Sequence, residues 1–140
     1  MNKLKTKVKS GDLRVLIADP DNAFRGSLLD SLQAHSWNAT GCSDGQSVVK
    51  LLEEEPGSYL LYLCLDMPDA GSAACLDHLS RLQVDLHLRF LTNGPCADSI
   101  AARMMAEARD LKVRRTIYKP ISPNDFQRIV ASDAQEYAGK

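Results

Sequence analysis

The 140-residue chain predicts an α/β domain with a parallel sheet covered by helices on both faces. Two observations lead to this prediction. Short apolar segments of strand length alternate with segments whose apolar residues recur at helical spacing. Each apolar segment also ends in polar or turn-forming residues. The length is that of one compact domain, and a domain of this size buries enough surface to fold without disulfides or a structural metal.

Five segments have the length and apolar content of buried strands. The run over residues 59–65 is the most apolar in the chain, so we expect it to be a central strand covered on both faces. The strands are predicted over residues 13–18, 39–42, 59–65, 86–91 and 115–118.

The segments that follow these strands have the spacing of amphipathic helices. The last helix has the clearest start, because Ser122 suits the cap position and Pro123 suits the first turn. Asp21 or Asn22 is the expected cap of the first helix. The helices are predicted over residues 24–32, 48–55, 74–83, 97–111 and from 123 onward.

Composition limits the classes of function. We divide the chain into a basic arm over residues 1–11, one domain over residues 12–134 and a tail over residues 135–140. Alternate lysines make the arm basic, and we expect it to be a solvated end. The net charge of −1 argues against nucleic-acid binding through bulk charge. No run is apolar and long enough to span a membrane, so we expect a cytoplasmic protein.

The cysteines are too widely spaced to predict a zinc site, and we expect reduced thiols. They are Cys42, Cys64, Cys75 and Cys96.

Polar residues stand where the predicted strands end. In an open parallel sheet these ends share one crevice, which is the usual place for a ligand. We therefore expect an acidic pocket with one lysine and one hydroxyl. Its members are Asp19, Asp21, Cys64, Asp66, Thr92 and Lys119.

The order of these residues resembles the receiver domain of bacterial response regulators, and the resemblance covers nearly the whole chain. The Met-Pro pair after the third strand and the Lys-Pro pair after the fifth are its most specific signals. The matching segments are Val15-Leu16-Ile17-Ala18-Asp19-Pro20-Asp21, Asp66-Met67-Pro68-Asp69-Ala70-Gly71, Phe90-Leu91-Thr92-Asn93 and Tyr118-Lys119-Pro120.

The resemblance implies a flavodoxin-like (βα)5 sandwich of three layers, with a five-stranded parallel sheet in the order 2-1-3-4-5. It also implies a site for aspartyl-phosphate chemistry. In that site a carboxylate ending the third strand is the nucleophile, and two adjacent acids after the first strand help to hold Mg²⁺. A hydroxyl and a lysine bind the phosphoryl oxygens. Asp19, Thr92 and Lys119 match three of these positions.

Two positions depart from the pattern. Counting back from Met67 without a gap places Cys64 at the acceptor position, and Pro20 stands where the second adjacent acid belongs. A thiol does not replace a carboxylate as a Mg²⁺ ligand. We therefore expect no cofactor and weak or lost Mg²⁺ binding, with Asp19 and Asp21 as the remaining metal candidates. We also expect Lys119 to pair with Asp19.

Two alternatives remain open at this point. Asp66 also follows the apolar run, and it becomes the acceptor if the loop after it is two residues shorter than in the family. Cys64 beside Lys119 suggests a thiol redox sensor, because a neighbouring ammonium lowers the pKa of a thiol. The ordinary interpretation of Cys64 is a small buried apolar residue.

The resemblance also bears on the output of the domain. It places a switch residue, often aromatic, three positions before the lysine, where this chain has Thr116. It implies a contact surface formed by the fourth helix, fifth strand and fifth helix. Several cations in this region favour an acidic partner, namely Arg109, Lys112, Arg114 and Arg115.

From these residues we expect a non-enzymatic, degenerate receiver of a two-component phosphorelay. It acts without phosphorylation, by contact with a protein such as a histidine kinase or another signalling protein, and not with nucleic acid or a membrane.

Overall fold

The computed structural model describes residues 13–67, 70, 72–94 and 97–138. Strands and helices alternate along this part of the chain, as the sequence predicts. The strands are β1 (Leu13–Ala18), β2 (Asn38–Cys42), β3 (Ser58–Cys64), β4 (Asp85–Thr92), β5 (Lys112–Val113) and β6 (Ile117–Tyr118). The helices are α1 (Asn22–Ala34), α2 (Gly45–Glu54), α3 (Ala73–Arg81), α4 (Ala97–Ala108) and α5 (Pro123–Ala138).

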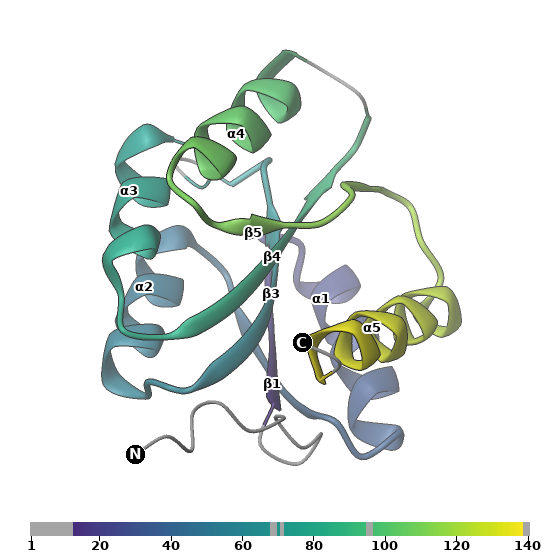
Figure 1. The fold of residues 1–140 in the computed structure, drawn as a ribbon. Helices are drawn as coiled ribbons and strands as arrows, with labels where there is room; N and C mark the ends of the chain where they lie inside the picture. The colour runs from purple at the N-terminus through teal and green to yellow at the C-terminus, as the bar shows by residue number, and fades with distance from the viewer. Residues whose placement is uncertain (1–12, 68–69, 71, 95–96, 139–140) are drawn as a thin grey trace.

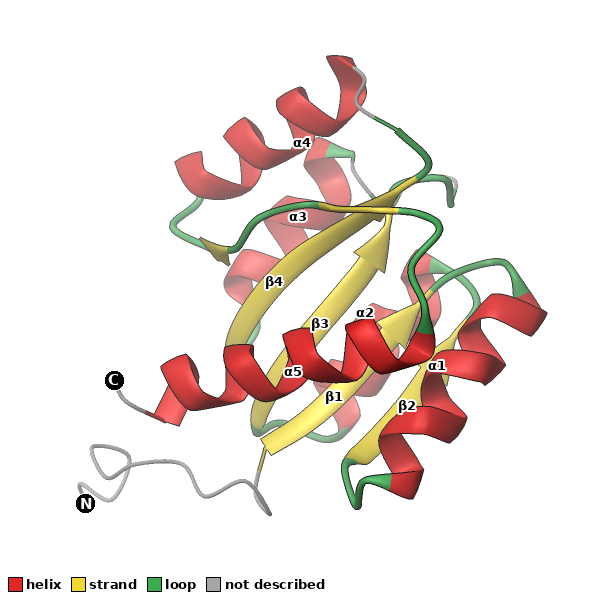
Figure 2. Cartoon of the chain, turned by 90° about the vertical axis from the view of Figure 1, so that its right-hand side faces the viewer, coloured by secondary structure: helices red, strands yellow, loops and turns green. Residues whose placement is uncertain are grey.

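The strands form one parallel sheet with the order β2-β1-β3-β4-β5, and β6 also pairs with β4. Helices α1 and α5 cover one face of the sheet, and α2, α3 and α4 cover the other, which gives three layers (Figure 1). Figure 2 shows α5 lying beside α1 on the same face of the sheet, and the two helices are in contact. This is the predicted flavodoxin-like arrangement, with the fifth strand position shared by β5 and β6.

The core lies on both faces of the central strands. In β3 every residue from Tyr59 to Cys64 is buried, because helices cover the strand on either side. In β1 the residues from Val15 to Ala18 are buried for the same reason. These two apolar runs are therefore the central strand of the sheet and one of its two neighbours.

Polar side chains begin the helices as expected. The carboxylate of Asp21 accepts a hydrogen bond from the backbone N–H of Phe24 and caps α1. The hydroxyl of Ser122 accepts one from the N–H of Asp125 at the start of α5. None of the described helices is long and apolar enough to cross a membrane.

The fifth strand position contains a bulge. Val113 lies opposite Leu88 and Ile117 lies opposite Leu91, so residues 114–116 of this segment face only residues 89–90 of β4. The predicted strand over residues 115–118 is therefore shorter at its start, and the pair Lys112–Val113 is an addition to it. An extra residue of this kind turns side chains away from regular alternation.

Helix α5 continues past residue 134, where the sequence analysis ends the domain. It continues to Ala138 and so includes most of the segment that the sequence assigns to a tail over residues 135–140. The reason is tertiary packing, because Tyr137 is buried and its hydroxyl donates a hydrogen bond to the backbone carbonyl of Asp85. The predicted basic arm lies outside the described residues.

Candidate functional site

The parallel sheet brings four of the predicted pocket residues together. Lys119 follows β6 and extends toward the ends of β1 and β3. Its Nζ lies 3.0 Å from Asp19 Oδ2, 3.6 Å from Cys64 Sγ and 3.9 Å from Asp66 Oδ2. The ammonium is therefore the centre of the cluster, with two carboxylates and one thiol around it.

The expected pair of Asp19 and Lys119 is present and largely buried. The Asp19 side chain is fully buried, and that of Lys119 is 11% exposed. Burial alone would lower the pKa of Lys119, but the hydrogen bond to Asp19 and the nearby negative charges outweigh it and raise the pKa. The ammonium also lies 4.8 Å from the centre of the Phe24 ring, which is a favourable cation–π distance.

Cys64 is the last residue of β3, opposite Leu91 of β4, and it is buried. Its Sγ accepts hydrogen bonds from Lys119 Nζ and from the backbone N–H of Asp66, and its thiol donates to Asp66 Oδ2 over 3.6 Å. Burial raises the pKa of the thiol to about 11, and Lys119 offsets only part of that effect. The group is accordingly a protonated thiol at neutral pH.

Asp66 lies in the turn after β3, two residues beyond the end of the strand. Its side chain is 36% exposed, and its Oδ2 accepts a hydrogen bond of 2.6 Å from the side-chain amide of Asn93. The sequence did not predict this contact between Asn93 and Asp66. The only available signal was its place next to Thr92 at the end of β4, and that position does not reveal which loop the amide reaches.

Two of the predicted pocket residues have other contacts. Asp21 directs its carboxylate to the start of α1, and its backbone N–H donates to Asp19 Oδ1 over 2.9 Å. Thr92 is buried, and its hydroxyl donates to the carbonyl of Gly94 over 3.4 Å within its own loop. The Thr92 hydroxyl is therefore bonded within its own loop, whereas the Thr92 backbone carbonyl accepts from the N–H of Lys119 over 2.8 Å.

No model of a known protein family matches the chain. The response regulator receiver protein CpdR of Brucella abortus (strain 2308) is 30% identical over 79 residues, which are 56% of this chain and 65% of that relative. The match therefore spans less than two thirds of the relative's length.

Solved structures match far more of the chain. A response regulator from Colwellia psychrerythraea superposes with a TM-score of 0.71 at 20% identity, over 89% of this chain and 98% of that one. A CheY-like response regulator receiver domain from Methanospirillum hungatei JF-1 gives 0.73 at 18% identity, over 89% and 94% of the two chains. The chain has the fold of a CheY-like receiver domain.

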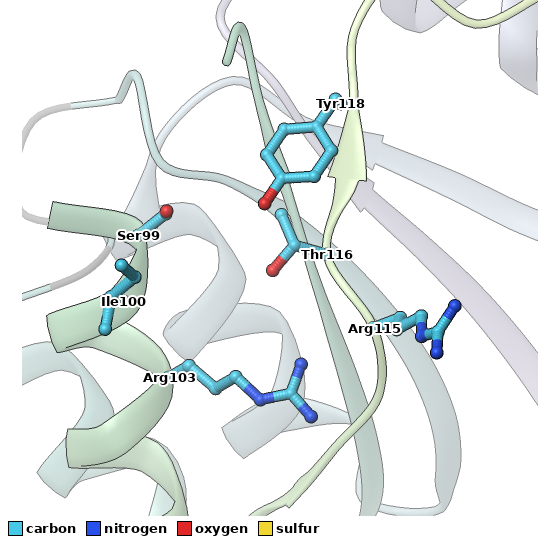
Figure 3. Close-up of a pocket in the computed structure, with 6 residues that line it drawn as sticks. All are labelled: Ser99, Ile100, Arg103, Arg115, Thr116 and Tyr118. Atoms are coloured by element: carbon cyan, nitrogen blue, oxygen red, sulfur yellow. The ribbon is translucent and has the colours of Figure 1, made fainter. Parts of the chain in front are cut away.

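The expected switch position of this receiver fold lies in the bulge. Thr116 lines a surface cavity of about 290 Å³ between α4 and the strand segment, together with Tyr118 (Figure 3). Figure 3 shows Arg103 extending from α4 toward the strand, whereas the guanidinium of Arg115 points away from α4. The aromatic ring at this surface is therefore that of Tyr118, which is 49% exposed.

Most of the cations that suggested an acidic partner are paired within the receiver fold. Arg109 lies 3.4 Å from Asp77 and Lys112 lies 3.9 Å from Asp85. Arg114 forms ion pairs with Asp133 and Glu136 on α5. Within the described part of the chain, Arg115 is the member of this group that has no carboxylate partner. The positive charge that is free for a partner is thus smaller than the sequence alone indicates.

Proposed function

We propose that this chain is a receiver domain of two-component signalling that acts by phosphorylation-independent contact with a protein partner. The observation that carries the proposal is the position of Cys64 at the end of β3, next to a Lys119 that already pairs with Asp19. The resemblance places the accepting carboxylate at this strand end. A protonated, buried thiol supplies neither that carboxylate nor a hard oxygen ligand for Mg²⁺.

The surroundings of Asp19 support the same proposal. Its Oδ1 accepts from the N–H of Asp21, and its Oδ2 accepts from Lys119. The ammonium is within hydrogen-bonding distance of the carboxylate that would otherwise bind a cation. Pro20 has no side-chain oxygen, and Asp21 caps α1, so neither residue assists. We propose that Mg²⁺ binds weakly or not at all, including at Asp19 and Asp21.

Asp66 is the alternative acceptor. In favour of it, the carboxylate is partly exposed and lies 3.9 Å from Lys119 Nζ. Against it, the same oxygen is bonded to Asn93, and the residue lies in the turn rather than at the end of the strand. We therefore propose that Asp66 is not phosphorylated. Incubation with a phosphodonor distinguishes this hypothesis from the alternative.

A thiol redox sensor at Cys64 receives less support. The nucleophilic and oxidisable form of cysteine is the thiolate. Because burial raises the pKa of Cys64 to about 11, only a very small fraction is thiolate at neutral pH. Lys119 lies close enough to act on the thiol, but Asp19 and Asp66 oppose its effect.

We propose that the partner, a histidine kinase or another signalling protein, contacts the face formed by α4, β5, β6 and α5. Three large apolar side chains are exposed there, namely Ile100 at 62%, Met104 at 65% and Tyr118 at 49%. They surround the cavity of Figure 3 or lie one helical turn from it. Exposed apolar groups of this kind are common where a protein binds another protein.

The test is incubation with acetyl phosphate and Mg²⁺, followed by the intact mass of the protein. The parent chain is expected to gain no phosphoryl group. The double variant Cys64→Asp with Pro20→Asp is expected to gain one, since Asp19 and Lys119 are already in place. A gain by the parent that Asp66→Ala abolishes would establish the phospho-accepting alternative. A folded double variant that stays unmodified would show that Cys64 is not at the acceptor position.

A further inference from the structure

The side chain of Asp66 joins the ends of three strands. Its residue lies in the turn after β3, its Oδ2 accepts from Asn93 after β4, and the same oxygen lies 3.9 Å from Lys119 after β6. The Cys64 thiol is a further donor to this oxygen. A single carboxylate oxygen is thus surrounded by an amide, an ammonium and a thiol. Such a set of donors is the environment of a bound anion.

Hydrogen bonds to Cys64 hold the turn that carries Asp66 in this position. The backbone N–H of Asp66 donates to Cys64 Sγ over 3.4 Å, so the chain folds back over the thiol directly after the strand. The next turn residue, Met67, is buried and donates its N–H to the Cys64 carbonyl over 3.4 Å. The carboxylate of Asp66 therefore lies over Cys64 because of the local backbone.

The charges distinguish the roles of the two carboxylates. Asp19 is fully buried and lies 3.0 Å from Lys119, so these two groups form a compact neutral pair. Asp66 is more exposed and farther from the ammonium, and Asn93 provides its shortest hydrogen bond at 2.6 Å. Asp66 is thus an added anion on the solvent side of the pair. It occupies the position that an oxyanion from solution would need in order to reach Lys119.

We infer that Asn93, Cys64 and Lys119 form an oxyanion slot and that the Asp66 carboxylate is its resident ligand. The inference rests on the proposed function, and it explains why this receiver fold needs no phosphoryl group to join its strand ends. The internal carboxylate holds the loop after β4 to the turn after β3. It also excludes dissolved phosphate, both by occupying the slot and by repelling a second negative charge.

The experiment uses the full chain and inorganic phosphate as the probe, followed by backbone and side-chain amide NMR signals. In Asp66→Ala the slot is empty, so phosphate is expected to cause saturable shifts at Asn93, Cys64 and Lys119 in the millimolar range. The parent is expected to show no saturable shift. Asp66→Ser leaves similar space and is expected to bind phosphate as Asp66→Ala does, which provides a second variant if the first folds poorly.

Two controls test whether the binding is specific. Glu54→Ala removes one exposed negative charge from α2 and is expected to behave as the parent, so a general change of net charge would be detected. Adding Lys119→Met to Asp66→Ala is expected to abolish the phosphate shifts. If phosphate binds neither Asp66 variant, or binds the parent equally well, the slot assignment is overturned.

The outcome of this titration is independent of the acetyl phosphate test. A parent chain that gains a phosphoryl group on Asp66 overturns the proposed function, and the resident-ligand role with it. An unmodified parent whose Asp66 variants ignore phosphate overturns the slot alone.

Discussion

Arg89 forms a bidentate ion pair with Asp133, with Nη2 2.6 Å from Oδ1 and Nε 3.1 Å from Oδ2. The carboxylate is 2% exposed, and it also accepts a hydrogen bond of 2.7 Å from the hydroxyl of Tyr62. Arg114 Nε lies 2.9 Å from Oδ1, and Arg114 also pairs with Glu136. Asp133 therefore ties α5 to β3, to β4 and to the bulge after β5. Two arginines and two carboxylates leave the cluster electrically balanced.

Removing the central carboxylate should be costly. Asp133→Ala leaves the guanidinium groups of Arg89 and Arg114, whose side chains are 14% and 21% exposed, without their shared partner. Loss of one member of a buried ion cluster typically costs about 3–5 kcal/mol of unfolding free energy. Glu136→Ala removes a half-exposed partner of Arg114 and should cost about 0–1 kcal/mol. Urea unfolding of the two variants measures the difference. Equal losses would mean that the cluster is not the anchor of α5.

The Lys119–Asp19 pair should hold the end of β6 to the end of β1. Lys119→Met leaves Asp19 fully buried without a counter-charge, and since the crevice is partly open we expect a loss between about 1 and 5 kcal/mol. Lys50→Met, at an exposed lysine of α2, is the control and should change stability little. A Lys119→Met protein that is as stable as the parent, with unchanged amide shifts in β6 and α4, would rule out this role.

The sequence predicts much of this fold because the deciding signals are local. An apolar run such as residues 59–65 can only be buried on both faces in a domain of this size, and parallel strands bring their carboxyl ends to one edge. Those two facts, together with the strand order that the resemblance implies, predict that Asp19 and Lys119 meet at this edge.

Other features depend on contacts that no local pattern encodes. The bulge at residues 114–116 brings Arg114 to Asp133, a partner on a different element. Tyr137 near the end of α5 is buried, and its hydroxyl donates a hydrogen bond to the carbonyl of Asp85. The Asn93–Asp66 hydrogen bond likewise joins two loops whose mutual position depends on the packed sheet. Each of these pairs is distant in sequence, and no local pattern links its two members.

Stability should decrease in alkaline solution. Burial and Asp133 raise the pKa of Tyr62 well above its usual value, and burial raises the pKa of Tyr137 and that of Cys64, the latter to about 11. The unfolded chain releases these protons at lower pH, with thiols near pH 8.5 and phenols near pH 10. The folded state therefore binds more protons than the unfolded state in this range. The stabilisation from these groups is fully present below about pH 8.5, and the free energy of unfolding falls as the pH rises above that value.

This pH dependence can be measured as the urea midpoint at a series of pH values from neutral to alkaline. Tyr62→Phe removes one of the titrating groups and should flatten the decline. A urea midpoint that stays constant through the range where phenols ionise would contradict the buried, protonated state of Tyr62, Tyr137 and Cys64.

Magnesium should have little effect on the parent chain. Mg²⁺ requires several oxygen ligands in near-octahedral geometry, but Cys64 and Pro20 provide none from their side chains, and Lys119 already lies 3.0 Å from Asp19. We expect no saturable amide shifts at the crevice in millimolar Mg²⁺. Lys119→Met removes the competing ammonium and leaves two carboxylates, so it should bind Mg²⁺ more tightly than the parent. Saturation of the parent below a millimolar would show that its carboxylates still form a metal site despite Lys119.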